Sequence, residues 1–212
     1  MEGLTPEIPF FCIHLARATE REDFMIHFQN VIGRPVRVWP ASSEKDVDHM
    51  PRKHPHEMET KIGELACLLS HVRLLEKMVA DETPVMGIFE DDAEAVTSLV
   101  HIKEFVEDVD PNWDILFLGA NQWVEFSNNT PTIVSVVRFW GTHAFLIKLE
   151  AAKKVLAMYT SLFEKGFAYP ADWLYAKSIR DYSLVAYGPT NPKGFIRQKP
   201  GLVSAITGKV RT

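Results

Sequence analysis

Three consecutive acidic residues, Glu90, Asp91 and Asp92, directly follow an apolar stretch of the chain. That stretch, Val85 to Phe89, has the length of a buried strand, which delivers the residues after it to one fixed edge of a sheet. Carboxylates crowded there repel one another, and they stay charged at neutral pH when a cation lies among them. A divalent metal holding a diphosphate would supply that charge, and a solvated acidic strand end is the alternative.

The spacing within the acidic run indicates which carboxylates could act together. Residues two apart in an extended segment face the same way, so Glu90 and Asp92 can share a face. One of them could bind a metal while the other binds a ribose hydroxyl or a metal-bound water. Hard carboxylate oxygens suit Mn²⁺ or Mg²⁺. The two cysteines, Cys12 and Cys67, lie in apolar stretches, and we expect both to be buried, reduced and outside any metal cluster.

A polar pair lies within a strongly periodic segment. Apolar residues between Ile62 and Ala80 recur at i, i+3, i+4 and i+7, which predicts an amphipathic helix. Ser70 and His71 lie on or beside its apolar face. They either pack as hydrogen-bonded core residues or point into a donor pocket. Gly63 costs a helix about 1 kcal/mol relative to Ala, which suits a close approach by backbone or ligand.

Two arginines, Arg17 and Arg21, follow the first predicted strand, Ile8 to Leu15. Guanidinium groups at a strand end are suited to phosphate recognition. The alternative is a solvated start to a short helix that ends near Asn30.

Strands and helices alternate along the first half, which predicts an α/β sandwich with a mostly parallel central sheet. Ligands of such sheets bind at the carboxyl ends of the strands, so the loop after Leu15, the acids and the turn after Leu118 should meet. Two of the predicted strands should pair around Gly141 and Thr142. The strands are expected at 8–15, 36–39, 85–89, 115–118, 133–140, 143–147 and 184–187, the further helices at 98–109, 149–163 and 172–180, a loop over a cleft at 40–56, and an irregular tail from 189.

Composition limits the class of protein. A chain of 212 residues with 46% hydrophobic and 24% charged residues is expected to form one folded domain. Its net charge of −5 argues against a nucleic-acid-binding surface. No apolar run reaches the roughly 18 residues of a transmembrane helix, and residues 1–9 do not resemble a signal peptide. These features favour a cytoplasmic protein.

Six segments of the chain form an ordered set of motifs. They are Ile13-His14-Leu15 with Arg17 and Glu20-Arg21, Gly63 to His71, Phe89 to Asp92, Gly141 to Ile147, Ala152-Lys153-Lys154, and Pro170 to Trp173. In residue types and order they resemble the motifs of glycosyltransferase family 25, which includes lipooligosaccharide and collagen galactosyltransferases. The resemblance extends over roughly residues 10–204, and His14 and Phe145 depart from the family's usual Asn and Tyr.

The resemblance implies a GT-A fold and transfer of a hexose, galactose or glucose, from a UDP-sugar to a hydroxyl of a lipid-linked or protein-linked glycan. The nucleotide-sugar half would span about 1–125 and the acceptor half about 126–212. Asp92, with Glu90, would bind Mn²⁺ or Mg²⁺, and the metal would act as a Lewis acid on the diphosphate. The residues implied to contact the nucleotide sugar are His14, Leu15, Arg17, Arg21, Ser70, His71, Glu90, Asp91 and Lys199.

An inverting transfer also needs a base for the acceptor hydroxyl, and Asp172 is the first candidate. An Asp after a proline could instead be a helix N-cap, and in a retaining enzyme it would bind hydroxyls. His143 is the second candidate, with an ordinary strand residue as the alternative. Lys199 could close over the diphosphate as part of a lid, or lie in a loose terminus. Trp123 and Trp173 lie near polar loops and could stack on sugars.

Two other functions remain open from the sequence. A domain of this kind could bind or hydrolyse nucleotide sugars without efficient transfer. It could also be a non-catalytic, metal-binding interaction domain with a solvated acidic loop.

Overall fold

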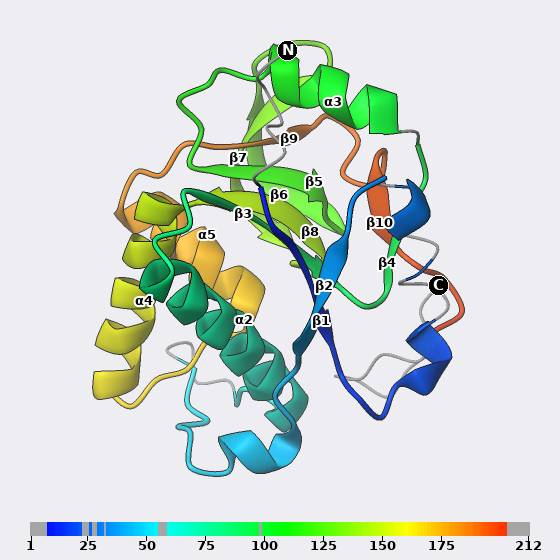
Figure 1. Cartoon of the computed structure of the whole chain (residues 1–212). Coiled ribbons are helices and arrows are strands. Elements are labelled where there is room, and N and C mark those ends of the chain that lie inside the picture. The colour runs from blue at the N-terminus through cyan, green and yellow to red at the C-terminus, as the bar shows by residue number, and fades with distance from the viewer. Residues whose placement is uncertain are drawn as a thin grey trace.

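The computed structural model describes residues 8–202 apart from 23–25, 27–28, 32, 55–58 and 98. An eight-stranded sheet forms the middle layer (Figure 1). Helices α2 (Ile62–Ala80), α4 (Leu149–Glu164) and α5 (Ala171–Asp181) cover one face, and α3 (Leu99–Asp108) covers the other. The α/β sandwich expected from the sequence is confirmed.

The sheet is mixed, and it is mostly parallel in the sense that six of its eight strands run in the same direction. In space the order is β2 (Val36–Pro40), β1 (Phe10–His14), β3 (Val85–Glu90), β8 (Ala144–Lys148), β5 (Ile115–Gly119), β9 (Ala186–Pro189), β7 (Ile133–Trp140) and β6 (Gln122–Asn128). The pairings make β8 and β7 run opposite to the other six strands. The carboxyl ends of β1, β3 and β5 therefore lie at one edge.

The predicted pairing of 133–140 with 143–147 is wrong. β8 lies between β3 and β5, whereas β7 lies between β9 and β6. Phe145, Leu146 and Ile147 are at most 1% exposed, so both faces of β8 need cover, which the centre of the sheet supplies. Gly141, with φ of +88°, turns the chain between the two strands without making a hairpin.

The strongly periodic segments formed the predicted helices. α2 has the predicted bounds because its leucines at 65, 68 and 75 are almost fully buried against the sheet. Burying one leucine side chain stabilises the fold by roughly 1.5–3 kcal/mol. The helix expected to end near Asn30 lies largely outside the described residues. The 3₁₀ turn η1 (Thr19–Arg21), which is described, precedes it. The loop after β2 contains a second 3₁₀ turn, η2 (Glu44–Val47).

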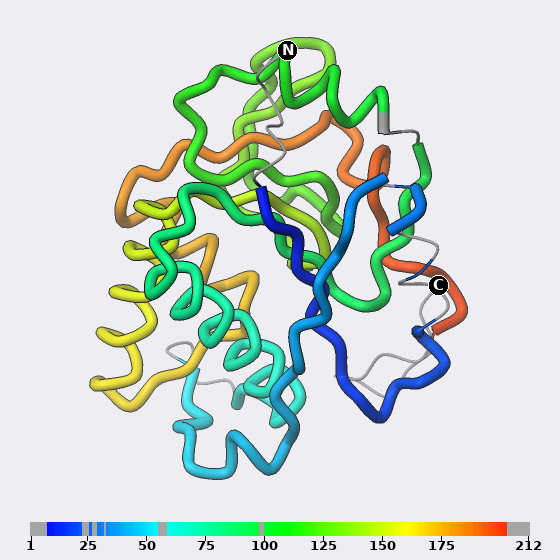
Figure 2. Tube along the Cα trace, viewed as in Figure 1, coloured from blue at the N-terminus to red at the C-terminus, as the bar shows by residue number. Residues whose placement is uncertain are grey.

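Four strands differ from the expectation for the chain beyond residue 90. The strand β6 is mostly exposed and lacks the apolar alternation that would reveal it. The short strands β4 (Ala93–Ala95) and β10 (Ile196–Gln198) pair antiparallel, so part of the expected tail is ordered. Figure 2 shows this C-terminal segment beside the chain that follows β3. The last predicted strand, 184–187, is shifted to β9.

Within the part of the chain that the structure describes, no helix has both the length and the apolar character needed to cross a bilayer.

Candidate active site

The predicted convergence at the carboxyl edge of the sheet is present. The loop after β1, the acidic run after β3 and the first turns of α2 surround a cavity of about 80 Å³. Its polar lining brings together most of the sequence-predicted nucleotide contacts. The lining includes Leu15, Arg17, Arg21, Gly63, Cys67, Ser70, Glu90, Asp91 and Asp92. A second cavity of about 350 Å³, lined by His14, Val36 and Val38 among others, shares Glu90 and Asp91 with the first.

Asp91 fixes the loop that follows β1. Its Oδ2 accepts hydrogen bonds from the Leu15 amide at 3.3 Å and is 3.0 Å from the His14 Nδ1, while its Oδ1 accepts from the Arg21 guanidinium. Asp91 and Arg21 are 7% and 4% exposed, so this ion pair is buried. A buried acid with three partners on one loop positions that loop, and it has few remaining sites for a ligand.

Replacing Asp91 by Ala is therefore expected to lower the free energy of unfolding by about 3–5 kcal/mol, because it strips a buried guanidinium of its nearest carboxylate. Urea unfolding followed by circular dichroism measures this. Glu44→Ala is the matched control, because Glu44 pairs with Arg17 at the exposed surface, and it should cost at most about 1 kcal/mol. A loss of unfolding free energy in Asp91→Ala as small as that of Glu44→Ala, at most about 1 kcal/mol, would show that the Asp91 contacts contribute little.

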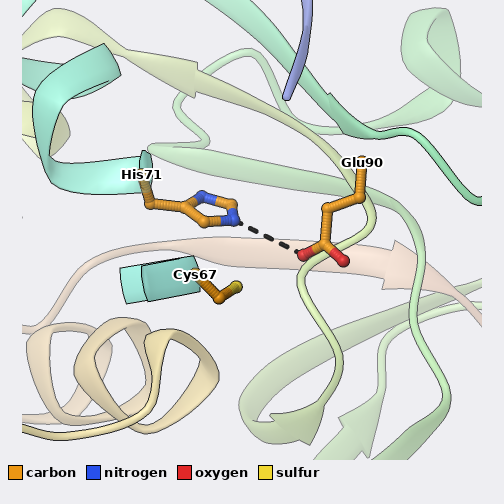
Figure 3. Close-up of side chains that lie close together, drawn as sticks. All are labelled: Cys67, His71 and Glu90. Atoms are coloured by element: carbon orange, nitrogen blue, oxygen red, sulfur yellow. Dashed lines mark hydrogen bonds and ion pairs between the residues drawn. The ribbon is translucent and has the colours of Figure 1, made fainter. Parts of the chain in front are cut away.

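Glu90 ends β3 and turns toward α2 and the segment before β8. Its Oε1 accepts from the Thr142 hydroxyl at 2.6 Å and lies 3.4 Å from the His71 Nε2 (Figure 3). Burial alone would raise the pKa of Glu90, but hydrogen bonding to His71 and Thr142 and the charge of the imidazole together hold this pKa below its usual range. Glu90 is therefore a carboxylate across the whole working pH range.

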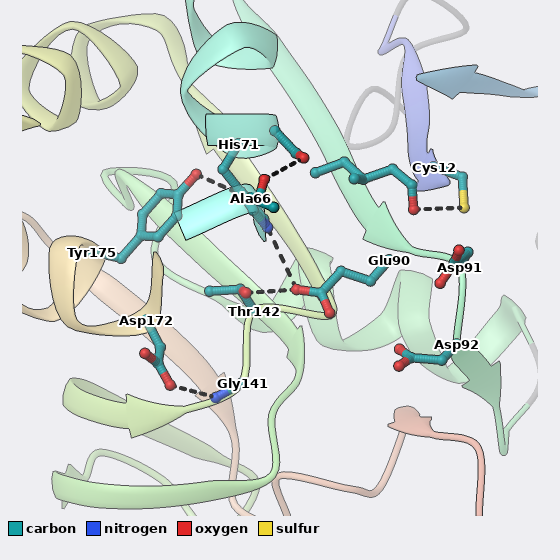
Figure 4. Close-up of polar contacts among 12 residues, drawn as sticks. Cys12, Ala66, His71, Glu90, Asp91, Asp92, Gly141, Thr142, Asp172 and Tyr175 are labelled. Carbon is teal, nitrogen blue, oxygen red and sulfur yellow. Dashed lines mark hydrogen bonds and ion pairs between the residues drawn. The ribbon is translucent and has the colours of Figure 1, made fainter. Parts of the chain in front are cut away.

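Asp92 lies at the back of the cavity, with 1% of its surface exposed. Its Oδ2 is 3.9 Å from the Arg21 guanidinium. In Figure 4 the Asp92 carboxyl group points toward the side on which the Glu90 carboxyl group lies. The main chain of Asp92 is held from the far end of the protein, because its carbonyl accepts from the Lys199 amide at 2.7 Å. The Lys199 ammonium donates to Glu94 at 3.3 Å.

Asp172 is the second residue of α5. The N-cap of α5 is Pro170, so the helix-capping alternative for Asp172 is wrong. Its carboxyl group accepts from the Gly141 amide at 3.2 Å and from the Trp173 amide at 2.9 Å. Burial raises the pKa of Asp172 to about 6; the two amides oppose that rise, and the charges of Glu90 and Glu64 add to it.

Two adjacent residues link the carboxyl groups of Glu90 and Asp172. Gly141 donates its amide to Asp172, and Thr142 donates its hydroxyl to Glu90 (Figure 4). The turn between β7 and β8 therefore sets the spacing of the two acids. Any change in that turn would move both groups.

His143 and Ser70 occupy interior positions. His143 is 0% exposed, with its Nε2 3.3 Å from the Ile196 carbonyl, and its own carbonyl accepts from the Glu90 amide. Ser70 is 1% exposed; its hydroxyl donates to the Ala66 carbonyl and accepts from the Ser42 amide. Ser70 thus ties the loop after β2 to α2 beside the cavity.

An aromatic cavity of about 430 Å³ lies beside α5, and of its main residues the sequence indicated Trp173 but not Arg138 or Trp140. Trp140 and Trp173 line it with ring centroids 5.7 Å apart, and the Arg138 guanidinium lies 5.2 and 4.8 Å from their centroids. Arg138 and Trp140 are two apart on β7, a spacing that would have placed them on one face. Trp123, by contrast, is buried, and its indole donates to the Pro189 carbonyl.

The expectation that both cysteines lie outside any possible metal cluster needs correction. Cys67 is partly exposed at the cavity of about 80 Å³, one helical turn from His71, and both face Glu90 (Figure 3). The i, i+4 spacing on one helix face was the signal that could have found this pair. Cys12 is buried in β1, as expected.

Residues 7–139 match the model of "Glycosyltransferase family 25 (LPS biosynthesis protein)". An Aedes aegypti protein named "Glycosyltransferase 25 family member" is 27% identical over 186 residues, which cover 74% of this chain and 30% of that protein. The human "Inactive glycosyltransferase 25 family member 3" is 29% identical over 169 residues, covering 69% and 28%. The chain thus spans about a third of the length of these relatives.

Among solved structures, one similar chain is a Drosophila galactosyltransferase in complex with manganese, UDP-Gal and xylobiose. It shares 13% identity with a TM-score of 0.48, and the alignment covers 90% of this chain and 69% of that one. A likeness at this level bears on neither substrate nor metal here.

Proposed function

Because the chain belongs to glycosyltransferase family 25, we propose that it is a metal-dependent transferase that moves a hexose, galactose or glucose, from a UDP-sugar to a glycan hydroxyl. The observation that carries this proposal is the meeting of four features at one cavity. These are the Glu90 and Asp92 carboxyl groups, the arginines after β1 and the first turns of α2. Together they offer both signs of charge to a metal-bound diphosphate.

The residues present fit a hard divalent cation. Asp92 would hold Mn²⁺ or Mg²⁺, with Glu90 as the second carboxylate, because oxygen ligands suit both ions. When bound, the cation neutralises charge on the leaving diphosphate. Arg21, 3.9 Å from Asp92, limits the negative charge at this point.

The two cavities that share Glu90 and Asp91 support a division of the donor. We place the diphosphate beside Arg17 and Arg21, and the nucleoside toward the adjoining cavity, whose valines at 36 and 38 offer an apolar surface. His14 lines the adjoining cavity and is held by Asp91. The transferred sugar would then point toward Thr142 and Asp172.

The acceptor would approach from the side of α5. Asp172 is the residue we assign to the acceptor hydroxyl, and its pKa of about 6 suits a group that accepts a proton at neutral pH. The cavity formed by Trp140, Trp173 and Arg138 offers aromatic faces for a sugar ring. His143 is less suited to act as the base, because its side chain is enclosed in the interior.

A panel experiment tests the function. Isothermal calorimetry of the protein against UDP-galactose, UDP-glucose and their GDP counterparts, with and without Mn²⁺, is expected to show Mn²⁺-dependent binding of a UDP-sugar. Mass spectrometry with lipid-linked and peptide-linked glycan acceptors then detects the hexose added. Absence of binding to every nucleotide sugar would contradict the proposal.

A second function follows from one of the relatives. The human relative of similar identity is named inactive, so a domain that binds a UDP-sugar without transferring it is the alternative. Donor binding in calorimetry without any glycan product, across the acceptor panel, would favour this alternative. A metal-binding interaction domain would bind Mn²⁺ without any UDP-sugar.

A further inference from the structure

The side chains of Cys67, His71 and Glu90 bring three different ligand atoms to one point. The sulfur, an imidazole nitrogen and a carboxylate oxygen all lie within 4.8 Å of one another (Figure 3). Cys67 and His71 come from successive turns of α2, and Glu90 ends β3. Two rigid elements therefore hold the group, which a ligand set requires.

The separation between His71 and Glu90 suits a shared cation. Their Nε2 and Oε1 atoms are 3.4 Å apart, longer than the roughly 2.7–2.9 Å of a charge-assisted hydrogen bond. Bonds of about 2.0–2.1 Å from nitrogen and oxygen to a tetrahedral zinc place those two atoms about 3.3–3.4 Å apart. The distances from the Cys67 sulfur to the other two ligand atoms, each at most 4.8 Å, can shorten by rotation of the Cys67 side chain, which is partly exposed.

Partners around the cluster orient two of the three ligands. The other imidazole nitrogen of His71, Nδ1, lies 3.4 Å from the Tyr175 hydroxyl, and the Phe145 ring stacks on the imidazole with an interplanar angle of 12°. With the Nδ1 proton donated to Tyr175, a cation that displaces the Nε2 proton would meet the Nε2 lone pair on the side that faces Glu90. The Thr142 hydroxyl fixes the Glu90 carboxylate at 2.6 Å. Such second contacts are the usual support of a metal-binding histidine.

The cluster is open on one side. Cys67 and Glu90 line the donor cavity, whereas His71 behind them is 1% exposed. A cation can enter from that cavity, and a water molecule there can complete a fourth position. Three protein ligands with one open position is the arrangement of exchangeable zinc sites.

We propose that Cys67, His71 and Glu90 bind a thiophilic divalent cation of the zinc class, at a site next to, and chemically distinct from, the hard-cation position at Asp92. A thiolate and an imidazole select Zn²⁺ or Co²⁺ over Mn²⁺ and Mg²⁺. Binding converts the Cys67 thiol to a thiolate and releases its proton to solvent. Because Glu90 belongs to both positions, the soft cation would hold this carboxylate in place beside the donor.

Cobalt substitution tests the site directly. The full chain, stripped of metal and kept reduced, is titrated with Co²⁺ and followed by its thiolate-to-cobalt charge-transfer absorption. The expected result is one equivalent of tightly bound Co²⁺, displaced by one equivalent of Zn²⁺ and unaffected by a large excess of Mg²⁺. Absence of that absorption in the wild-type chain would overturn the proposal, and would mean that His71 and Glu90 are joined by a hydrogen bond alone.

The two cysteines give matched variants. Cys67→Ala should abolish the charge-transfer absorption, whereas Cys12→Ala should retain it, because burial raises the pKa of the Cys12 thiol and disfavours its thiolate. Retention of the band in Cys67→Ala would exclude Cys67 as a ligand. His71→Gln is expected to weaken Co²⁺ binding at least about tenfold, and circular dichroism confirms that each variant is folded.

A further variant separates this site from the proposed donor site. Asp92→Asn should keep the cobalt–thiolate band while it loses Mn²⁺-dependent binding of the UDP-sugar. A band with no UDP-sugar binding in the wild-type chain would remove the proposed function and leave the soft-cation site standing. UDP-sugar binding in the wild-type chain without a cobalt–thiolate band would remove the soft-cation site and leave the proposed function standing.

Discussion

An Asp92→Asn variant is expected to bind UDP-sugars at least about 100-fold more weakly in the presence of Mn²⁺, and to remain folded. Loss of a residue that only orients a metal ligand already costs about 10- to 100-fold in affinity, and Asp92 is proposed as a ligand itself. The amide is isosteric and keeps an oxygen, but it lacks the charge that a diphosphate-bound cation needs. Calorimetry with Mn²⁺ in excess measures the change.

The control for Asp92→Asn is Asp108→Asn, at the exposed end of α3. It makes the same chemical change away from the cavity, and its affinity for the donor should equal that of the wild-type chain. Wild-type affinity in Asp92→Asn would exclude Asp92 as the metal ligand and leave Glu90 as the carboxylate to be tested. Binding that is equally weak with and without Mn²⁺ in both proteins would exclude a metal-dependent donor site.

Asp172→Asn is expected to lower the rate of hexose transfer about 10²- to 10⁴-fold, the range for removal of a general base. Donor affinity should change little, because Asp172 bonds to Gly141 and Trp173 rather than to the donor cavity. Burial disfavours the charged form of Asp172, so the neutral amide should not destabilise the fold at neutral pH. Steady-state kinetics with saturating donor separates transfer from binding.

The pH dependence of transfer gives an independent measure of Asp172. Its pKa is raised to about 6, and a base must be deprotonated to act. The rate should therefore be constant above about pH 7 and fall about tenfold between pH 7 and pH 5. Glu90, held at a lower pKa by His71 and Thr142, stays ionised across that range. The residual rate of Asp172→Asn should lack this fall.

Asp108→Asn again serves as the control and should keep both the rate and the pH profile. Full transfer activity in Asp172→Asn would rule out the carboxyl group as the base. A reduced rate with an unchanged pH profile would mean that Asp172 binds the acceptor without taking its proton, as expected for a retaining enzyme.

The convergence at the carboxyl edge of the sheet could be predicted from the sequence because its signals are local. The acidic run, the arginines after β1 and the periodicity of α2 each lie within a short segment, and the rule that ligands gather at carboxyl strand ends joined them. The role of each of the three acids could not be predicted from any local pattern. Asp91 is occupied by His14, Leu15 and Arg21, and those partners lie 70 to 77 residues away along the chain.

The acceptor side depended on long-range pairing and was predicted less well. Adjacent strands along a chain usually pair, and that tendency led to the wrong hairpin of β7 with β8. The link from Asp172 through Gly141 and Thr142 to Glu90 needs β8 at the centre of the sheet. The aromatic cavity needs β7 beside α5, and Cys67 took on a possible role only once β3 lay against α2.

The pairing of β4 with β10 makes completion of the site depend on the order of synthesis. Ala95 in β4 pairs with Ile196 in β10, and the Asp92 carbonyl accepts from the Lys199 amide. A ribosome adds about 5–20 residues per second, so the roughly 100 residues between these strands take about 5–20 seconds to make. During that interval the acidic turn can have its contacts with the loop after β1, through Asp91, but not those from β10 and Lys199. The last contacts that hold the main chain of Asp92 therefore form only near the end of synthesis.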